Sequence, residues 1–556
     1  MGGRSLNRRL LLMVLALGLC FVGLLGRAFY LQVVKAAEYT KRAESQHLTT
    51  VELPVKRASI LDRDGAVLAM TVETVSICAN PALVDDPAGA AKLLAPVLEI
   101  PEANLVEKLS QKGTFVYLAR KADPMVAERA CLLRIPGVFG QAEDKRYYPQ
   151  GAVASHLLGF VGIDMDQGLE GVEKQYNHLL SGKAGSRTTV TDDQGRVLEV
   201  VTETPPDPGT DVTLTIDKDI QYALEQILTQ TVEESEAKRA IAIVLEPKTG
   251  EVLALATTPA FDSNLYLEEE ADDRRNHPVT DLFEPGSTFK LVVAAAALAE
   301  QLVTPDTMFT LAPTIQVGDV TIREASDGVP AQRELTVTDI VVQSSNVGAV
   351  TLGLKVGTEK LCRMIRAFGF VEHTGIDAPG EVAGLMLPPD KWNLGTVANV
   401  PIGQGISVTA VQLAAAYGAV ANDGVWIQPH VTKMVESPVT RRVVNPQVAA
   451  QLRTMLTETV KRGTGNAAAL DGYSIAGKTG TAEKALENGM GYAKDKYLAS
   501  FVGMIPADDP QVVILVAVDE PQNAHLGSEV AAPVFASIAD FIVKHLGIPP
   551  EEGAGE

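Results

Sequence analysis

One long apolar run stands near the N-terminus. Residues 10–26 carry no charge, three arginines precede them within residues 1–9, and mostly apolar residues continue to Val34. A helix over 10–34 exceeds a hydrocarbon core of about 30 Å, and positive charge before it places the N-terminus in the cytoplasm. The pattern predicts an uncleaved signal anchor, single-pass, with the rest of the chain outside. A cleaved signal peptide is the alternative, which the length of the run disfavours.

Farther along, the apolar positions follow helical or strand spacing. Residues 216–231 place Ile220, Leu224 and Leu228 one turn apart, which predicts an amphipathic helix. Short apolar runs bounded by turn residues predict strands, and an apolar segment near the C-terminus predicts another helix. The strands are 241–245, 252–256, 497–503 and 512–518, and the helix is 531–545. This order predicts a mixed α/β domain with a mainly antiparallel sheet.

A proline-rich cluster at 205–209 predicts a domain boundary. We therefore expect an N-terminal pedestal over 35–210 and a second, larger domain over 211–547. The acidic, glycine-containing end at 548–556 is interpreted as a disordered tail.

The pedestal offers charged residues but no nucleophile–base pair. Asp64-Gly65 predicts a tight turn between extended segments. We interpret Arg57, Asp62, Arg146 and Glu173 as buried charge pairs and turn residues rather than as a site.

Composition narrows the classes of function. The net charge of -21 argues against nucleic acid as a partner, because a polyanion would be repelled. The histidines are dispersed without an H-E-x-x-H motif, and no cysteines form a C-x-x-C pair; the cysteines are Cys20, Cys78, Cys131 and Cys362. We therefore predict no catalytic metal, no cofactor and no thiol redox centre.

Three short motifs carry the candidate chemistry. They are Ser287-Thr288-Phe289-Lys290, Ser344-Ser345-Asn346 and Lys478-Thr479-Gly480-Thr481. A serine hydroxyl needs a neighbouring base to act as a nucleophile, and a lysine three residues later on a helix lies on the same face. The set predicts a serine acyl-transfer site.

The first and third motifs each occur a second time, at Ser235–Lys238 and Lys248–Gly250. Ser235 lies in a run of charges that indicates a solvated helix end, and Lys248 lies in a hairpin turn between two apolar runs. Ser287 instead follows a Pro-Gly pair and precedes an apolar stretch, which predicts a buried helix with the serine at its N-terminus. This context favours Ser287.

The three motifs in this order, with Gly403-Gln404-Gly405, the anchor and the pedestal segments 57–65 and 146–173, resemble class B penicillin-binding proteins. The resemblance covers nearly the whole chain. It implies a peptidoglycan D,D-transpeptidase that cross-links stem peptides ending in D-Ala-D-Ala, and that β-lactams inhibit covalently. It also implies a β-lactamase-like domain, with an antiparallel sheet flanked by helices and an all-α part, on an elongated, mostly β pedestal of the dimerisation type.

Within the class, Glu284-Pro285-Gly286-Ser287 and Ser344-Ser345-Asn346 resemble the division-type members, the penicillin-binding protein 3 group, and imply septal wall synthesis. The elongation-type penicillin-binding protein 2 group usually has Asp in the second motif and is the alternative. The chain departs from the family in Arg57-Ala58-Ser59, where Arg-Gly is usual, and in Asp262-Ser263-Asn264, where Asp-Pro-Asn is frequent. Both departures lie outside the three motifs.

The resemblance also implies catalytic roles. Ser287 is the nucleophile, and Lys290 is its base, with a pKa lowered by burial beside Lys478. Ser344 relays protons, and Asn346 orients Lys290 and binds a substrate amide.

The resemblance also assigns substrate binding to the third motif. Lys478, Thr479 and Thr481 face the substrate's terminal carboxylate, and Gly480 lets the substrate backbone approach the strand. The backbone N–H groups of Ser287 and Thr481 form the oxyanion hole.

Other classes of protein share parts of this pattern. A D,D-carboxypeptidase or β-lactamase-like hydrolase passes the acyl group to water, but no E-x-x-L-N segment lies between Asn346 and Lys478 to position that water. A β-lactam sensor needs further membrane helices, and a pure scaffold does not need every catalytic position filled.

The resemblance implies partners and a location. The partners are peptidoglycan stem peptides, a SEDS-family glycan polymerase and divisome proteins. The location is the bacterial inner membrane, with the catalytic domain in the periplasm.

Overall fold

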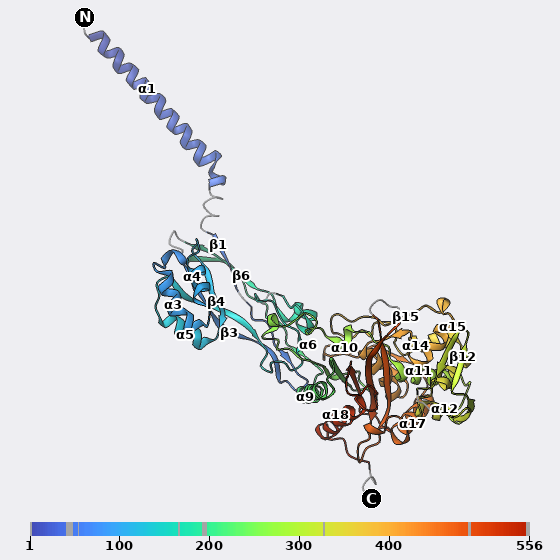
Figure 1. Cartoon of the computed structure of the whole chain (residues 1–556). Coiled ribbons are helices and arrows are strands. Elements are labelled where there is room, and N and C mark those ends of the chain that lie inside the picture. The colour runs from blue at the N-terminus through green and yellow to red at the C-terminus, as the bar shows by residue number, and fades with distance from the viewer. Residues whose placement is uncertain are drawn as a thin grey trace. The chain divides into compact units, whose positions relative to one another are not determined.

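The computed structural model describes residues 3–39, 48–53, 55–164, 167–191, 197–325, 329–486 and 491–551. It forms two compact units, which Figure 1 draws in one chain. The first comprises Met1–Lys56 and Gly182–Gly209, and the second comprises Arg57–Ser181 and Thr210–Glu556. The predicted domain boundaries, 1–9, 10–34, 35–210, 211–547 and 548–556, stay predictions.

The first unit holds the apolar N-terminal helix. Helix α1 (Gly3–Phe29) continues into a π-helical turn, η1 (Tyr30–Val34). The stretch Asn7–Val34 is long and apolar enough to cross a membrane, and none of it is buried within the protein. The same unit carries an antiparallel sheet of order β1-β6-β7, with strands β1 (Leu48–Leu53), β6 (Gly185–Thr191) and β7 (Val197–Thr204).

The second unit begins with a sheet of order β4-β3-β2-β8, in which β5 also pairs with β3. Its strands are β2 (Ile60–Leu61), β3 (Val67–Ala79), β4 (Val116–Ala122), β5 (Val138–Tyr147) and β8 (Val212–Thr213). Its helices are α3 (Pro87–Leu98), α4 (Glu102–Leu109), α5 (Pro124–Leu132), α6 (Ser155–Leu158), α7 (Gly171–Gln175) and α8 (Asn177–Leu180).

The predicted pedestal was mostly β, and the structure adds three helices, α3 to α5, to this region. Their buried side chains, Leu94, Leu105 and Leu109 among them, share one core with β3 and β4. Asp86 and Asp123 cap α3 and α5, and a proline follows each of them at the first helical position. Asp-Pro is a start signal readable in the sequence, but the helices are short and their periodicity is weak.

The charged residues of this region are structural, as predicted. The Glu173 carboxylate is fully buried and accepts hydrogen bonds from Nε of Arg57 and of Arg146, each at 2.7 Å. Asp62 accepts from the backbone N–H groups of Asp64 and Ala66, which closes the turn before β3.

Replacing Glu173 by glutamine should lower the free energy of unfolding by about 3–5 kcal/mol, because two buried guanidinium groups lose their counter-charge. The measurement is the denaturation midpoint of the full chain in detergent. Glu203→Gln is the control, since Glu203 pairs with Arg187 on an exposed surface and its loss should barely move the midpoint. Equal shifts for the two variants would contradict the assignment.

The rest of the second unit, from Thr210 onward, is built on a five-stranded antiparallel sheet of order β10-β9-β21-β20-β19. Its strands are β9 (Arg239–Leu245), β10 (Val252–Thr258), β19 (Ala476–Ala485), β20 (Tyr492–Ile505) and β21 (Val512–Asp519). The predicted strands lie within β9, β10, β20 and β21. The mixed α/β class with an antiparallel sheet is confirmed.

Alternate residues of β9 enter different cores, because side chains of a strand point to opposite faces. Ala240 and Val244 join the core under α9 (Lys218–Ser235) and α18 (Ala531–His545). Ile241 and Ile243 join the core on the other face, which includes α11 (Lys290–Ala299), α16 (Ala410–Ala421) and α17 (Pro446–Arg462).

The remaining helices form the all-α part, and short strand pairs accompany them. The helices are α10 (His277–Thr280), α12 (Val337–Val342), α13 (Asn346–Val356), α14 (Thr358–Ala367) and α15 (Leu394–Asn399). The pairs are β11 (Met308–Leu311) with β14 (Arg333–Thr336), β12 (Thr314–Val317) with β13 (Val320–Arg323), β15 (Leu385–Met386) with β16 (Ile406–Ser407), and β17 (Val425–Ile427) with β18 (Thr440–Arg442).

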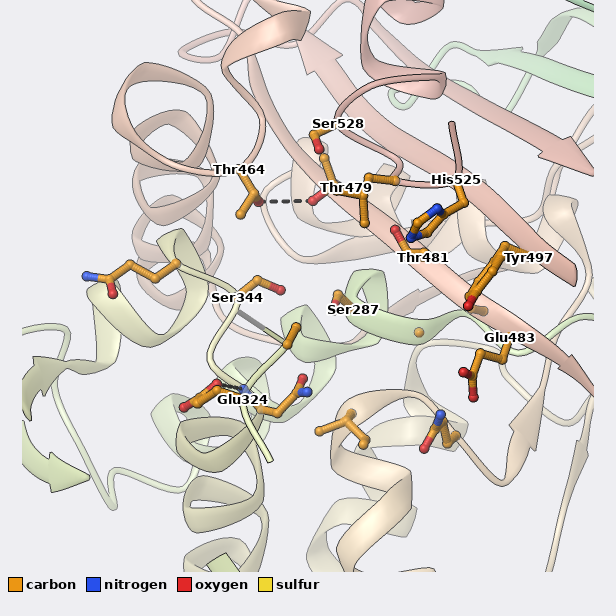
Figure 2. Close-up of a pocket in the computed structure, with 18 of the residues that line it drawn as sticks. Ser287, Glu324, Ser344, Thr464, Thr479, Thr481, Glu483, Tyr497, His525 and Ser528 are labelled. Carbon is orange, nitrogen blue, oxygen red and sulfur yellow. Dashed lines mark hydrogen bonds between the residues drawn. The ribbon is translucent and has the colours of Figure 1, made fainter. Parts of the chain in front are cut away.

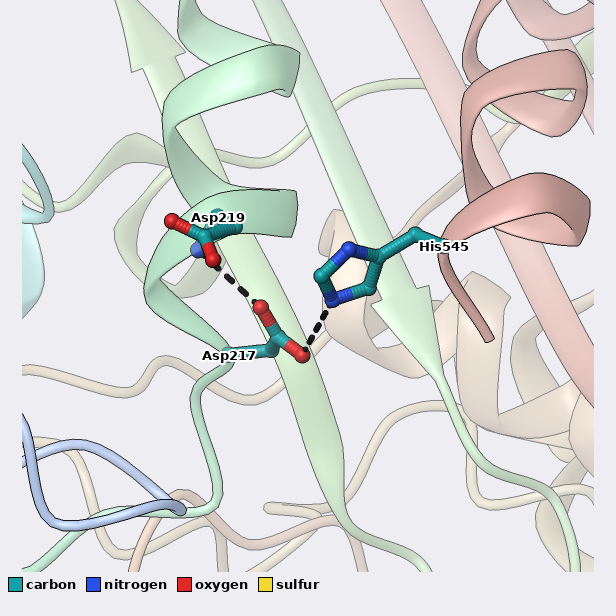
Figure 3. A group of neighbouring side chains, drawn as sticks. All are labelled: Asp217, Asp219 and His545. Carbon is teal, nitrogen blue, oxygen red and sulfur yellow. Dashed lines mark hydrogen bonds and ion pairs between the residues drawn. The ribbon is translucent and has the colours of Figure 1, made fainter. Parts of the chain in front are cut away.

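The ends of α9 and α18 meet in a polar contact (Figure 3). Asp217 caps α9 by accepting from the backbone N–H of Asp219 and of Ile220. Its other carboxylate oxygen lies 2.9 Å from Nε2 of His545 at the end of α18. A helix cap and an interhelical contact account for these side chains, so the group is interpreted as structural.

The chain end is partly anchored. The Glu551 carboxylate accepts from the backbone N–H of Ser474 at 2.9 Å, and Tyr473 donates to the carbonyl of Ile548 at 2.8 Å. The predicted disordered tail begins at 548, and its last residues, 552–556, lie outside the described part of the chain.

Candidate active site

Ser287 lies where the chain enters a buried helix. A short 3-10 turn, Gly286–Phe289, leads into α11, and residues 290–298 of that helix are all buried. Gly286 has φ +54, and the carbonyl oxygen of Thr481 lies 3.0 Å from where its Cβ would be. A glycine therefore suits this turn, and the predicted buried helix with the serine at its start is present.

Ser287 lines a cavity of about 570 Å³, and residues from all three motifs line it too. Ser344 and Asn346 come from the second motif, and Thr479 and Thr481 come from the third. Figure 2 shows Ser287 between the Ser344 turn and strand β19. The fold thus brings together segments that are far apart in the sequence.

Lys290 is almost fully buried and points its amine at the second motif. Its Nζ donates to the carbonyl oxygen of Ser344 at 2.5 Å, to Ser344 Oγ at 3.1 Å and to Asn346 Oδ1 at 2.7 Å. Burial, and next the charge of Lys478, lower the pKa of Lys290 well below its usual value. A lysine with a lowered pKa is suited to act as a base.

The second motif is a strained turn between α12 and α13. Ser344 has φ +56, a left-handed conformation that is unfavourable for serine. The hydrogen bonds from Lys290 to its carbonyl and hydroxyl help to hold it there. Asn346 uses Oδ1 for Lys290 and donates from Nδ2 to the carbonyl of Arg323 at 3.0 Å, which leaves one amide hydrogen for a ligand.

Sequence reasoning missed Glu324, which anchors this turn. Its carboxylate accepts from Ser345 Oγ at 2.6 Å, from the backbone N–H of Asn346 at 2.8 Å and from Arg333 at 2.6 Å. The carboxylate therefore caps the start of α13 and carries a paired charge. It belongs to no motif, so no local signal identified it.

Lys478 is fully buried on strand β19. Its Nζ donates to Thr464 Oγ1 and to the carbonyl and hydroxyl of Thr479, each at 3.3 Å. Burial lowers the pKa of Lys478 to about 7. Thr464, which also exchanges a hydrogen bond with Thr479 Oγ1 at 2.9 Å, was not predicted, although Gly463-Thr464-Gly465 is a readable turn signal.

Thr481 keeps a donor free for a ligand. Its hydroxyl oxygen accepts from the backbone N–H of Gly527 at 3.0 Å, so its proton can point into the cavity. At Gly480 a Cβ would lie 2.4 Å from Ser500 Oγ and 3.0 Å from Thr288 Cγ2, so packing inside the protein also requires a glycine here. Its role in the approach of a substrate stays a prediction.

The Gly403-Gln404-Gly405 segment supports the nucleophile turn. Gly286 donates its backbone N–H to the carbonyl of Gly403 at 3.1 Å. A Cβ on Gly403, which has φ +81, would lie 2.0 Å from the carbonyl oxygen of Gly286. Gln404 lines the cavity.

Sequence reasoning also missed the residues that line the far end of the cavity. Beyond Thr481 it is lined by Glu483, Tyr497 and His525. The rings of Tyr497 and His525 stack, with centroids 4.5 Å apart and an interplanar angle of 27°. Tyr497 reads only as part of a strand in the sequence.

The second copies of the motifs lie elsewhere. Ser235 ends α9 and donates to the carbonyl of Thr231 at 2.5 Å. Lys248 lies in the turn between β9 and β10, where it pairs with Asp509 at 2.6 Å. Their interpretation as surface features is confirmed.

Two family models match the chain. The model described as "Penicillin binding protein transpeptidase domain" matches residues 240–540, and that described as "Penicillin-binding Protein dimerisation domain" matches residues 52–214.

Curated relatives match along nearly the full chain. Penicillin-binding protein PbpB of Mycolicibacterium smegmatis is 37% identical over 94% of this chain and 88% of its own length. Peptidoglycan D,D-transpeptidase FtsI of Escherichia coli is 34% identical over 95% of this chain and 90% of its own. Stage V sporulation protein D of Bacillus subtilis is 34% identical over 99% of this chain and 87% of its own.

Solved structures agree in fold. The crystal structure of penicillin-binding protein 3 from Mycobacterium tuberculosis, complexed with aztreonam, superposes with a TM-score of 0.71 at 31% identity. It covers 90% of this chain and 98% of that one.

Proposed function

The chain belongs to the penicillin-binding protein transpeptidase family, and from that premise we propose that Ser287 forms the acyl-enzyme of a class B peptidoglycan D,D-transpeptidase. The observation that carries the assignment is the buried Lys290, whose amine contacts Ser344 and Asn346 beside the nucleophile turn. The three motifs named from the sequence thus line or adjoin one cleft.

In the first step, Ser287 Oγ attacks the carbonyl carbon between the two D-alanines. Neutral Lys290 takes the serine proton, and the backbone N–H groups of Ser287 and Thr481 stabilise the oxyanion, worth about 3–4 kcal/mol per donor. The C–N bond then breaks, and the departing D-alanine amine receives a proton through Ser344.

In the second step, an amine from a neighbouring stem peptide attacks the ester carbon. The ester C–O bond breaks, and the proton of the attacking amine returns to Ser287 Oγ through Lys290. Charged Lys478 and the hydroxyls of Thr479 and Thr481 hold the donor's terminal carboxylate during the first step. A β-lactam acylates Ser287 in the same way, but its leaving group stays attached.

The second-order rate of acylation should rise and then fall as the pH increases. Lys290 must be neutral, so the second-order rate rises with pH while Lys290 loses its proton. Lys478 must be charged to attract a carboxylate, so the rate falls above about pH 7, where Lys478 becomes neutral. The measurement is the benzylpenicillin acylation rate against pH. In Lys478→Arg, whose side chain stays charged, the falling limb should vanish; an unchanged limb would refute its assignment to Lys478.

The biological role proposed is septal wall synthesis. FtsI of Escherichia coli supports it, but the sporulation relative matches at similar identity, so we test the role in cells. Depletion should produce filaments, whereas rounded cells would indicate the elongation role.

We extend the proposal to location and partners. The N-terminal helix would anchor the protein in the inner membrane with the N-terminus in the cytoplasm, since arginines precede the span. A SEDS-family glycan polymerase and other divisome proteins would then act beside the catalytic domain in the periplasm.

The test of the activity is the intact mass of the full chain in detergent after exposure to benzylpenicillin. We expect a lasting adduct, which proteolysis maps to the peptide containing Ser287. Hydrolysis of the drug without a lasting adduct would indicate a β-lactamase-like hydrolase, and no reaction would overturn the enzymatic assignment.

A further inference from the structure

Strand β19 is an edge strand, and the cavity runs beside it. Among the described strands, only β20 pairs with β19, at the end of the order β10-β9-β21-β20-β19. Thr479, Thr481 and Glu483 all line the cavity, as expected from the two-residue repeat of side chains along a strand. An extended peptide can therefore lie along this edge and meet the three side chains in turn.

The proposed function sets the direction of that peptide. The terminal carboxylate of the donor lies at Lys478 and Thr479, and the carbonyl under attack lies at Ser287 and Thr481. The residue that precedes the two D-alanines must then extend past Thr481 toward Glu483. Its side chain meets the far end of the cavity.

That end is acidic and aromatic. Glu483 is exposed, and among the described residues no ion pair engages its carboxylate. The adjacent cation, Lys484, is already paired with Asp519 at 2.8 Å and with Glu520 at 2.7 Å. Figure 2 shows Glu483 with the stacked rings of Tyr497 and His525 at the same end of the cleft.

A second carboxylate, Glu284, lies beside Glu483, because the two line a neighbouring cavity of about 230 Å³. Glu284 accepts from the backbone N–H of Gly405 at 2.8 Å and from Tyr492 at 3.0 Å. Neither partner carries a positive charge. Burial, with a smaller contribution from the charge of Glu483, raises the pKa of Glu284. Arg239 and Lys484 line the same neighbouring cavity, but each already pairs with an aspartate, Asp272 at 3.0 Å and Asp519 at 2.8 Å.

We propose that Glu483, with the Tyr497–His525 ring pair, selects donor stem peptides whose residue before D-Ala-D-Ala carries a free amine. The ammonium group pairs with the Glu483 carboxylate and lies against the Tyr497 ring, which also attracts cations. The inference rests on the proposed transpeptidase function, because that function fixes the direction of the peptide. It makes Glu483 a determinant of specificity for a cationic diamino acid.

The test compares ampicillin with benzylpenicillin. The two drugs differ by one ammonium group, on the carbon that corresponds to Cα of the residue before D-Ala-D-Ala, so the pair probes the charge of this end of the cavity, and the peptide pair described next probes the side-chain amine. The measurement is the ratio of their second-order acylation rates on the full chain. Glu483→Gln should lower the ampicillin-to-benzylpenicillin ratio about fivefold, and Glu483→Lys should lower it further, as expected for one partly exposed charge pair. Glu436→Gln is the control, because Glu436 is exposed and lies outside the cavity.

A peptide pair checks the result on a substrate-like ligand. Nα-acetyl-Lys-D-Ala-D-Ala should compete with benzylpenicillin better than its Nε-acetylated form, and Glu483→Gln should remove that difference. An unchanged drug ratio in Glu483→Gln overturns the proposal, as does an equal loss for both drugs, which indicates a structural role. Failure of the wild-type protein to react with benzylpenicillin instead overturns the proposed function.

Discussion

Replacing Ser287 by alanine is expected to abolish the benzylpenicillin adduct and to reduce transpeptidation by a factor of about 10⁴ or more. The acyl group bonds to Ser287 Oγ, which alanine lacks, and loss of the nucleophile in serine enzymes has effects of this size. The fold should survive, because Ser287 lines an open cavity rather than the core. The measurements are the intact mass after drug exposure and the rate of cross-linked product formation.

The chain supplies a matched control. Ser235 is followed by a lysine three residues later, as Ser287 is, but it ends helix α9 and bonds to the Thr231 carbonyl. Ser235→Ala should leave the adduct intact. An adduct that persists in Ser287→Ala, or disappears in Ser235→Ala, would show that the nucleophile is misassigned.

Replacing Lys290 by alanine should slow acylation by about 10²–10⁴-fold, the range typical of a lost general base. The initial, non-covalent binding of benzylpenicillin should be retained, because the side chains proposed to hold its carboxylate, those of Lys478, Thr479 and Thr481, are unchanged. Stopped-flow kinetics separate the two quantities, since the acylation rate at saturation should fall while the concentration for half-saturation changes little. Wild-type acylation rates in Lys290→Ala would contradict the assignment of Lys290 as the base.

Two further variants distinguish a role of Lys290 as a base from a purely structural role. Lys290 also holds the Ser344 turn through its carbonyl and hydroxyl, so alanine removes both functions. Lys290→Arg keeps the charge and the hydrogen-bond donors but cannot become neutral. If Lys290 is the base, acylation by this variant should be slow at every pH. If Lys290 only holds the Ser344 turn, arginine should partly restore the acylation rate. Lys238→Ala, from the second copy of the motif, should have no effect.

Local patterns identified much of this protein because they reflect burial of individual elements. The apolar stretch after Ser287 predicts a buried helix, and residues 290–298 are indeed buried. Short apolar runs bounded by turn residues located β9 and β20, and the lack of a nucleophile near Arg57 and Glu173 marked them as a buried pair. Helical and strand periodicities are fixed by a few neighbouring residues, so they can be read without knowledge of the fold.

Other features depended on contacts across long stretches of chain. Glu324 reaches the N-terminus of α13, 22 residues away along the sequence, and Lys290 reaches Asn346, 56 residues away. Gly480 is predicted to let a substrate approach the strand, and the fold adds a second reason for the glycine, because Ser500 and Thr288 lie beside it.

The sequence by itself determined the three motifs, an N-terminal helix long and apolar enough to span a membrane, and the mixed α/β class, and it predicted Ser287 as nucleophile and Lys290 as its base. Only the tertiary structure decided the electrostatics and the shape of the cleft. The pKa values of Lys290 and Lys478 follow from burial, which depends on how separate segments pack. The acidic end at Glu483 exists because β19 is the sheet edge, a property of strand order that no local sequence pattern encodes.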